Sequence, residues 1–251
     1  MTTATHITLI TGASRGIGAA AAIECARRGM GVILTYKNQS EAADAVVRRI
    51  VSAGGKAVAL QLDVGDVASF EAFGAAVRQA LERTFGAARL HGLVHNAGYG
   101  LYSPIEQVTP DQFDGLMNVH LKGPFFLTQT LLPLLADGAG IVNLTSATTR
   151  VATAGVAPYA AAKGALDVLT RYMAKEFGPR RIRANAVSPG AIRTDLGGGL
   201  NDEFEAMLAS QTALGRVGEA GDVASVIVSL LAGELAWVNA QSIEVGGGYQ
   251  I

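Results

Sequence analysis

The sequence predicts an α/β protein built on a Rossmann-type, doubly wound parallel sheet. Short β-type runs alternate with amphipathic helical stretches along all 251 residues, as in folds where helices cross over between parallel strands. Runs such as GVILTY (31–36) and GIVNLT (140–145) are almost continuously apolar, which is typical of strands covered on both faces. We therefore expect a single domain over residues 1–251, with about seven strands and helices on both faces of the sheet.

Each element follows from its hydrophobic pattern. The expected strands are 6–11, 31–36, 56–62, 89–95, 140–145, 181–188 and 241–245. The expected helices are 15–29, 40–53, 66–85, 109–136, 157–177, 201–212 and 220–232. The glycine-rich segment before 201–212 and the apolar residues of that helix suggest a small substrate loop or lid at about 190–215.

Composition narrows the class of partners and the compartment. The net charge of −1 gives no reason to expect nucleic acid or an anionic membrane as a partner. Charged residues make up only 16%, which suggests that some surface is buried against other subunits. The single cysteine, Cys25, allows no intrachain disulfide, and the chain start does not resemble a signal peptide. With no apolar run of about 18 residues, we expect a cytoplasmic protein that does not enter a membrane.

A glycine loop joins the first expected strand to the first helix. Gly12 permits a tight turn, Gly16 lets the backbone approach a pyrophosphate, and Gly18 lets the helix pack on the strand. Ser14, Arg15 and Ile17 lie within this loop. Since a helix N-terminus favours an anion, the loop predicts a dinucleotide site. An ordinary glycine-rich turn is the alternative.

The residues after the second and third strands indicate which dinucleotide is bound. An NAD site usually offers an acid at the end of the second strand, but here Lys37 follows it and no acid occurs before Glu41. Lys37 and Arg15 could face a 2′-phosphate. The sequence therefore favours NADP(H) over NAD(H), with a solvated surface lysine as the alternative for Lys37. Asp63 follows the third strand, where a helix N-cap is one possible role.

Three polar side chains that could reduce a carbonyl group follow later strands. Ser146 comes after the expected strand 140–145, and Tyr159 and Lys163 lie one helical turn apart. Carbonyl reduction needs a hydride on carbon and a proton on oxygen. The ammonium of Lys163 would lower the pKa of the Tyr159 phenol, and Ser146 could donate a hydrogen bond to the substrate oxygen. Asn118 could hold a water that returns protons to Lys163.

These motifs resemble, in order and spacing, those of the classical short-chain dehydrogenase/reductase family. The matching residues are the glycine loop 12–18, Asn96-Ala97-Gly98, Asn118, Ser146, Tyr159-x3-Lys163 and Pro189-Gly190. The resemblance covers essentially the whole chain. It extends to 3-oxoacyl-thioester reductases and broad carbonyl reductases, and it implies an NADP-dependent oxidoreductase that acts on CH–OH or C=O groups.

The resemblance also implies residue roles. Asn118, Ser146, Tyr159 and Lys163 would form a catalytic tetrad, and Asp63 would contact the adenine. The cofactor would be bound by Gly12, Ser14, Arg15, Gly16, Ile17, Gly18, Lys37, Asp63, Val64, Asn96, Ala97, Gly98, Tyr159, Lys163, Pro189, Gly190, Ile192 and Thr194. No metal is implied, and a homotetramer, or else a homodimer, is expected.

Two positions and the substrate side need separate predictions. His95 stands where the family often has asparagine, and we expect it to stabilise the strand ends. His120 is interpreted as a packing or surface residue. Tyr99, Thr148, Arg150 and Leu196 are expected to contact a small-molecule substrate, although Arg150 could equally be a surface arginine.

Two alternatives to a carbonyl reductase stay open at this point. One is a non-catalytic NADP(H)-binding sensor or scaffold of the same fold. The other is an NAD-dependent alcohol or sugar dehydrogenase.

Overall fold

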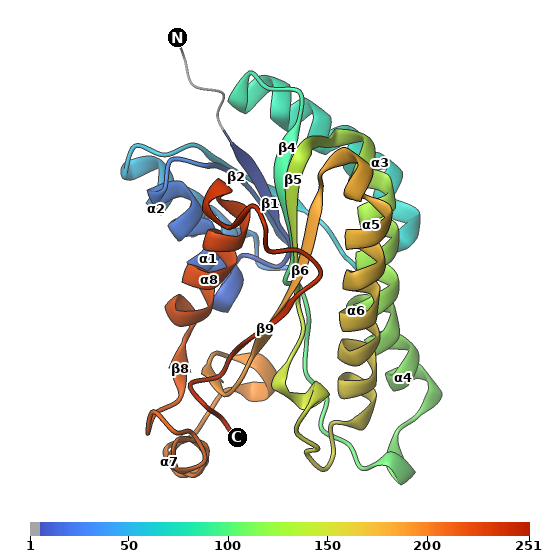
Figure 1. The fold of residues 1–251 in the computed structure, drawn as a ribbon, viewed down its shortest axis with the longest axis vertical. Helices are drawn as coiled ribbons and strands as arrows, with labels where there is room; N and C mark the ends of the chain where they lie inside the picture. The colour runs from blue at the N-terminus through green and yellow to red at the C-terminus, as the bar shows by residue number, and fades with distance from the viewer. Residues whose placement is uncertain (1–5) are drawn as a thin grey trace.

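A seven-stranded parallel sheet forms the centre of the protein, which is seen here in a computed structural model that describes residues 6–251 (Figure 1). The strands follow the order β3-β2-β1-β4-β5-β6-β9, and every neighbouring pair is parallel. Their bounds are β1 (Ile7–Ile10), β2 (Gly31–Tyr36), β3 (Ala57–Gln61), β4 (Leu90–His95), β5 (Leu135–Leu144), β6 (Arg183–Pro189) and β9 (Ser242–Val245). The structure confirms the predicted fold class.

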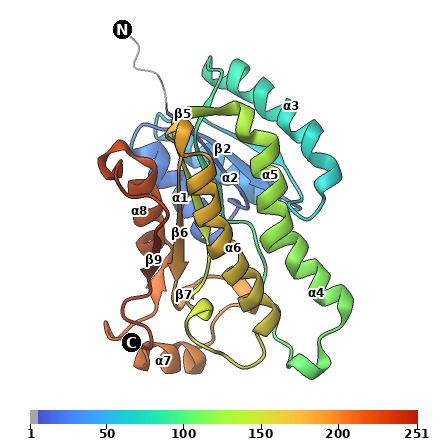
Figure 2. The ribbon, with the colours of Figure 1, turned by 45° about the vertical axis from the view of Figure 1, so that its right-hand side comes forward.

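Helices cover both faces of this sheet (Figures 1 and 2). One face carries α1 (Gly16–Arg27), α2 (Ser40–Ser52) and α8 (Ala220–Leu231). The other carries α3 (Phe70–Ala80), α4 (Pro110–Met117), α5 (Gly123–Leu131) and α6 (Ala157–Glu176). The short helix α7 (Asp202–Ser210) lies at the lower end of Figure 1, near the strand β8 (Gly218–Glu219) and the C-terminus.

The two helical layers pack on two separate hydrophobic cores. Ile7 and Leu9 of β1 point into the core beneath α3, α5 and α6, whereas Ile10 belongs to the core beneath α1 and α8. This alternation reflects the two-residue period of a strand, and burial on both faces explains the continuously apolar runs. Each large side chain buried in this way contributes about 1.5–3 kcal/mol of hydrophobic free energy.

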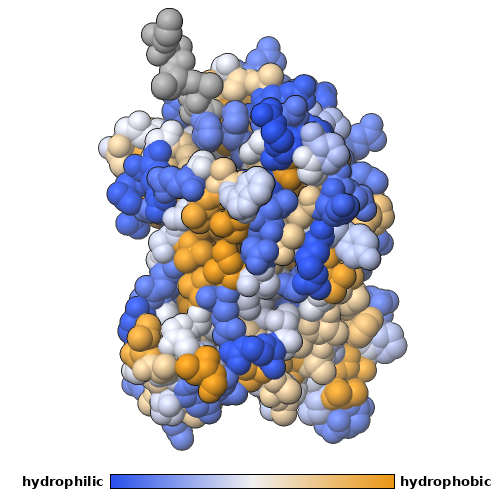
Figure 3. All heavy atoms as spheres, in the orientation of Figure 1, coloured by the Kyte–Doolittle hydropathy of each residue, from blue (hydrophilic) through white to orange (hydrophobic). Residues whose placement is uncertain are grey.

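Figure 3 shows where apolar side chains remain visible on one face of the molecule. In the orientation of Figure 1 they gather over α8 and β9. Partly buried apolar residues of this region include Val226, Val238, Ile243 and Val245. Because β9 is an edge strand of the sheet, this apolar surface lies beside unpaired strand edge.

Most predicted elements are present, but the long helix expected over 109–136 is not one regular α-helix. It consists of α4, a π-helical turn (Asn118–Lys122), α5 and a 3₁₀ turn (Leu132–Leu134), and β5 already begins at Leu135. The apolar pattern runs through these changes without interruption, so it could not mark them. A separate pair of two-residue strands, β7 (Ile192–Arg193) and β8 (Gly218–Glu219), was also not predicted, because two residues carry no periodic signal.

The strand order determines where a ligand can bind. The chain runs outward from β1 to β3, then crosses to β4 on the other side of β1. At such a reversal the loops after neighbouring strands diverge and leave a crevice at the carboxyl ends. Within residues 6–251, none of the helices has the length and apolar character needed to span a membrane.

Candidate active site

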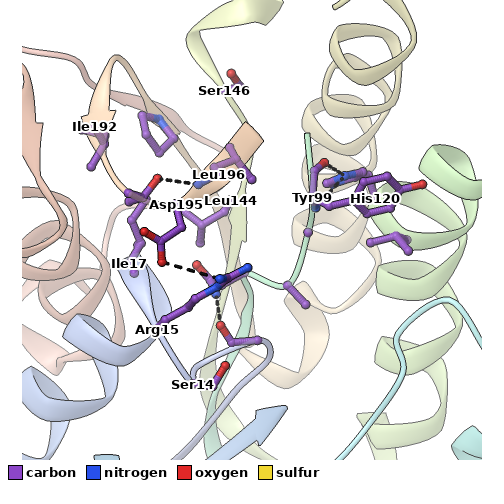
Figure 4. A pocket seen from close by; sticks show the side chains of 18 of the residues that line it. Ser14, Arg15, Ile17, Tyr99, His120, Leu144, Ser146, Ile192, Asp195 and Leu196 are labelled. Carbon is purple, nitrogen blue, oxygen red and sulfur yellow. Dashed lines mark hydrogen bonds and ion pairs between the residues drawn. The ribbon is translucent and has the colours of Figure 1, made fainter. Parts of the chain in front are cut away.

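A cavity of about 540 Å³ occupies the crevice at the carboxyl ends of the strands (Figure 4). It brings together most of the residues that the sequence assigns to cofactor, catalysis or substrate. Those that line it are Gly12, Ser14, Arg15, Gly16, Ile17, Lys37, Asp63, Val64, Asn96, Ala97, Gly98, Tyr99, Ser146, Tyr159, Lys163, Pro189, Gly190, Ile192, Thr194 and Leu196. The predicted residues Gly18, Asn118, Thr148 and Arg150 are not among its lining residues.

The glycine loop turns tightly because other backbone lies against it. Gly12 has a φ of +63°, and a Cβ there would come within 2.6 Å of the Cα of Ala97. A Cβ on Gly18 would lie 2.4 Å from the Nδ2 of Asn96. Asn96 in turn donates from Nδ2 to the carbonyl oxygens of Thr11 and Gly12, at 2.9 Å each. Asn96 and Gly18 therefore shape the loop, whose backbone faces the cavity.

Helix α1 begins inside the cavity with its first N–H groups uncapped. Arg15 is its N-cap residue, and no side chain of the described residues caps this end. Gly16 and Ile17, the first two helical residues, line the cavity. Free N–H groups and the helix dipole make this end suitable for a phosphate group.

Each of the two cations assigned to the 2′-phosphate has a carboxylate near it. Nζ of Lys37 lies 2.7 Å from Asp63, and Arg15 lies 3.6 Å from Asp195. Figure 4 shows the side chains of Arg15 and Asp195 pointing toward one another beside Ile17. Both pairs are largely exposed to solvent, and such pairs contribute about 0–1 kcal/mol. A phosphate could therefore compete for either cation at little cost.

Asp63 shapes its own loop in a different way from the predicted N-cap. The following helical turn starts at Val67 with Asp66 at its N-cap, whereas Oδ1 of Asp63 accepts a hydrogen bond from the N–H of Gly65 at 2.9 Å. Partial burial opposes ionisation of Asp63. Hydrogen bonds from Lys37 and Gly65 and the charge of Lys37 outweigh it and hold its pKa below the usual value. Asp63 therefore stays ionised beside the cavity.

Ser146, Tyr159 and Lys163 meet at the inner end of the cavity. Ser146 follows β5 in an extended conformation, and its hydroxyl lies close enough to the Tyr159 phenol to influence its pKa. Tyr159 lies in the first turn of α6, and Lys163 follows one turn later on the same side. Nζ of Lys163 donates to the carbonyl oxygen of Leu144 at 2.5 Å and lies 5.6 Å from the centre of the Tyr159 ring. Lys163 is only 4% exposed.

The predicted effect of Lys163 on the Tyr159 phenol is wrong for this structure. Burial raises the pKa of Tyr159 above its ordinary value, and the nearby hydroxyl of Ser146 only partly opposes this. Burial also lowers the pKa of Lys163 to about 7, because a charged ammonium is costly in a low-dielectric site. Lys163 is therefore only partly charged near neutral pH, which weakens its influence on the phenol.

Asn118 begins the π-helical turn and is half-buried behind the cavity wall. The helix that carries it approaches the loop after β3 very closely. A Cβ on Gly123 would lie 2.2 Å from the carbonyl oxygen of Val64, so glycine is required there. Single π-helical turns of this kind are frequent at functional sites.

The two histidines near the site are both buried. Nε2 of His95 lies 2.7 Å from Oγ1 of Thr128, and burial lowers the pKa of His95 to about 3. This contact joins β4 to α5. His120 lines the cavity and packs edge-on against Tyr159, with ring centres 5.1 Å apart. The sequence predicted that His120 is either a packing residue or a surface residue. In the structure it is a buried residue in the wall of the cavity.

Two predicted substrate residues do not reach the cavity. Arg150 forms an ion pair with Glu244 at 2.6 Å and donates to the carbonyl oxygens of Tyr249 and Gln250 at 2.7 Å each. It therefore joins the turn after Ser146 to the last residues of the chain. The hydroxyl of Thr148 is buried with no partner among the described residues.

Other lining residues carry no motif and were not assigned from the sequence. They are Tyr36, Asn38, Gln39, Leu62, Val119, His120, Leu144, Thr145 and Ala191. All are close in sequence to assigned residues, so their place at a strand end was the only available signal. Apolar side chains also line the cavity, among them Leu196, Leu200 and Leu208.

Comparison with known proteins places the chain in a family. The family model described as Enoyl-(Acyl carrier protein) reductase, of the short-chain dehydrogenase type, matches residues 12–250. With the parallel sheet, the glycine loop and the Ser146–Tyr159–Lys163 group, this match defines the class of protein. The chain belongs to the short-chain dehydrogenase/reductase family.

Individual relatives cover almost the full length. Versicolorin reductase stcU of Emericella nidulans is 36% identical over 257 residues, which cover 96% of this chain and 94% of the relative. The 3-oxoacyl-(acyl-carrier-protein) reductase FabG of Staphylococcus aureus is 33% identical, covering 97% and 98%. The crystal structure of the angucycline C-6 ketoreductase LanV with bound NADP superposes with a TM-score of 0.93 at 33% identity, covering 98% and 96%.

Proposed function

We propose that this protein is an NADP(H)-dependent reductase that converts a ketone on a rigid, largely apolar ring system to an alcohol. One observation carries the proposal. Ser146, Tyr159 and Lys163 lie together in the cavity whose other end is the uncapped N-terminus of α1. A proton donor and an anion site thus share one enclosed space, as hydride transfer from a nucleotide to a carbonyl requires.

The residues present fit a bound dinucleotide. Gly12 lacks a side chain where Ala97 leaves no room for one, and the free N–H groups of α1 face the same space. Lys163 is a buried ammonium with no ion-pair partner among residues 6–251, and ribose hydroxyls could accept its protons. When bound, the reduced nicotinamide supplies the hydride.

The chain's own residues supply the proton and hold the substrate. The Tyr159 hydroxyl donates its proton to the carbonyl oxygen as the hydride arrives at carbon. Burial raises the pKa of this phenol, so it carries its proton near neutral pH. Ser146 donates a hydrogen bond to the same oxygen as negative charge develops on it. Lys163 then returns a proton to Tyr159, with Asn118 as the proposed holder of a connecting water.

The end of β2 supports the choice of NADP(H). Tyr36, Lys37, Asn38 and Gln39 line the cavity there, and none of them is acidic. A carboxylate would repel a 2′-phosphate, whereas Lys37 and Arg15 would attract it. The similar ketoreductase LanV was crystallised with NADP bound.

The outer wall supports an apolar substrate. Tyr99, Leu196, Leu200 and Leu208 line the cavity, and Phe204 and Met207 are exposed on α7, the helix that carries Leu208. Residues 190–215 would act as a lid whose glycines allow it to move. A sugar needs several hydrogen-bonding partners, which these side chains do not provide. Relatives named for the reduction of versicolorin and of an angucycline point in the same direction.

The non-catalytic alternative is less well supported. A nucleotide sensor needs the glycine loop but has no need of a buried lysine and a tyrosine aligned on one helix face. Keeping Lys163 buried opposes folding, which is easier to understand if the group serves catalysis.

We further propose that the chain forms one domain that assembles into a homotetramer. Apolar side chains Phe113, Phe125, Val168 and Tyr172 are exposed on α4, α5 and α6. Exposed apolar surface of this kind marks association sites. Sedimentation analysis tests this, and a monomer at micromolar concentration would refute it.

A panel assay tests the function. NADPH or NADH consumption is followed with a fused-ring aryl ketone, a quinone, a steroid ketone, a β-ketoacyl thioester and a sugar. The proposal predicts turnover of a ring ketone with NADPH preferred. Turnover of the sugar alone with NAD would favour the dehydrogenase. NADPH binding without turnover of any compound would favour the sensor.

A further inference from the structure

His120 joins the wall of the cavity to the loop that carries Tyr99. It is 2% exposed, and its Nε2 lies 2.8 Å from the carbonyl oxygen of Tyr99. Its ring packs edge-on against Tyr159 at 5.1 Å between centres and lies 5.7 Å from the ring of Tyr99. Figure 4 shows Tyr99 and His120 together on the wall opposite Arg15 and Ile17. One side chain thus touches both the proton donor and a residue of the opening.

The contacts with Tyr99 bear on the protonation of the ring. Nε2 lies 2.8 Å from the carbonyl oxygen of Tyr99 and 3.4 Å from its amide nitrogen, so it can donate to the first or accept from the second. We assign the proton to Nε2, because the shorter contact is to an oxygen, which only accepts. Nδ1 is then an acceptor, and it is buried with no partner among the described residues. Burial, and then the nearby charge of Lys163, lower the pKa of His120 to about 3 despite the bond to Tyr99. His120 is therefore neutral under ordinary conditions.

The loop that His120 holds has few other attachments. Residues 98–102 belong to no helix or strand. Within the part of the chain that the structure describes, the one group that bonds to their backbone is Nε2 of His120, which contacts the carbonyl oxygen and the amide nitrogen of Tyr99. The next anchors are Ala97, bonded to Thr11, and Ser103, bonded to Gly155. Without His120, five consecutive residues at the opening would lack a hydrogen-bond anchor.

Gly98 has a steric reason to be glycine at this point. A Cβ there would lie 2.5 Å from Cε1 and 3.1 Å from Nδ1 of His120. The backbone of the loop therefore lies directly against the imidazole ring. The Tyr99 hydroxyl lies against α4, 2.7 Å from where a Cβ of Gly115 would be.

We propose that His120 is a positioning residue for substrate selection. It holds Tyr99 and the 98–102 loop in place, so that the opening of the cavity keeps the width that admits the ketone. This inference rests on the proposed function, because it assigns a role in that same site. A neutral donor on a rigid helical turn fixes the position of the Tyr99 carbonyl. The edge of the same imidazole ring packs against Tyr159 and so fixes the distance between Tyr159 and the loop. Loss of the donor would let the loop move and widen the opening. The ketone would then bind less well, while the nucleotide end would be unaffected.

Two substitutions separate the donor from the ring. In His120→Gln the side-chain amide can place an N–H near the position of Nε2, whereas His120→Phe keeps an aromatic edge and removes the donor. We expect His120→Phe to raise KM for the ketone about tenfold, as for one lost hydrogen bond with a residual orphaned carbonyl, with little change in kcat. His120→Gln should recover KM to within about threefold of wild type. The Kd for NADPH should stay unchanged in both.

His95→Gln is the matched control. It alters another buried histidine with a single side-chain hydrogen bond, but one that does not contact Tyr99. It should lower thermal stability and leave KM for the ketone as it was. If His120→Phe behaves like wild type, or if His120→Gln is impaired as much as His120→Phe, the donor has no positioning role and the inference fails.

A second measurement does not depend on turnover. Nitrogen-15 NMR of histidine-labelled protein, assigned with His120→Phe, should show His120 as the neutral Nε2–H tautomer from about pH 5 to pH 8. An Nδ1–H tautomer would leave Nε2 only as an acceptor from the Tyr99 N–H and would overturn the inference, which needs a donor. If no ketone is reduced by the wild type, the proposed function fails, and the NMR result still decides whether His120 donates to Tyr99.

Discussion

The ammonium group of Lys163 lies 2.5 Å from the carbonyl oxygen of Leu144, and the side chain is almost fully buried. None of the ion pairs formed within residues 6–251 includes Lys163. A charge held this way opposes folding, because burial removes water and no counter-charge replaces it. Lys163 should therefore lower the free energy of unfolding of the protein while it serves catalysis.

Replacing Lys163 by methionine should expose that conflict. The pKa is about 7 in the folded chain and 10.5 when unperturbed, so at pH 7 the unfolded state binds more protons. Folding stability of the wild type should rise with pH between these values. Lys163→Met should be more stable at pH 7 by roughly 1–4 kcal/mol, and its turnover should fall at least about 100-fold. Calorimetry at pH 7 and pH 9 measures this, and a variant less stable than wild type at pH 7 would count against the buried charge.

Gly12 should tolerate no side chain, for a reason specific to its place. A Cβ there would collide with Ala97 at 2.6 Å, in a backbone with a φ of +63°. In Gly12→Ala, backbone strain and overpacking together should lower the free energy of unfolding by about 2–4 kcal/mol. The variant should also bind NADPH poorly.

Gly54→Ala is its control. Gly54 has a φ of +86° and no atoms within 4 Å of a Cβ, so only the strain of about 1–2 kcal/mol applies. Denaturant titration measures the free energy of unfolding of both variants. An equal decrease in both would mean that the close contact between Gly12 and Ala97 adds nothing to the cost of a side chain at Gly12.

Lys37 should determine part of the cofactor preference. It lies 2.7 Å from Asp63 at the end of β2 and lines the cavity. Lys37→Asp should reduce the ratio of kcat/KM for NADPH to that for NADH by about 10–100-fold. Lys175→Asp makes the same charge change at the last turn of α6 and should leave the ratio alone. A ratio that is unchanged in Lys37→Asp would remove Lys37 from the phosphate site.

The buried histidines should make the fold sensitive to mild acid. His95 has a pKa of about 3 when folded against 6.5 unperturbed, mainly through burial. Between these values the unfolded state binds the proton, so stability is lost as pH falls below about 6.5. From pH 7 to pH 5 the loss should be about 1–2 kcal/mol for His95 alone. Urea unfolding at both pH values measures it, and His95→Gln should show a smaller loss than wild type. If the free energy of unfolding falls by the same amount from pH 7 to pH 5 in wild type and His95→Gln, His95 is not the titrating group.

The sequence was sufficient to predict the sheet and the outline of the site. Continuously apolar runs mark strands covered on both faces, and the strand-end positions of the glycine loop, Ser146 and Asn96 follow from the parallel order. The four-residue spacing of Tyr159 and Lys163 could be interpreted because a helix places such residues on one side. These features depend on local periodicity.

Features that depend on tertiary packing could not be predicted. The direction of the Tyr159 pKa shift depends on how deeply the phenol and Lys163 are buried. His120 lies in a π-helical turn that has no periodic signal, so its place beside Tyr159 was not foreseen. Arg150 turns toward Glu244 and the last residues of the chain, about a hundred positions away in sequence, and no local pattern indicates that contact.

The most direct test of the account is the turnover of Tyr159→Phe. NADPH binding is measured first by fluorescence, and ketone reduction is then followed with wild type and variant, both saturated with NADPH. We predict unchanged NADPH affinity and a fall in turnover of about 10²–10⁴-fold, because only the proton donor is removed. Turnover equal to wild type would contradict the assignment of Tyr159 as the acid and, with it, the proposed mechanism.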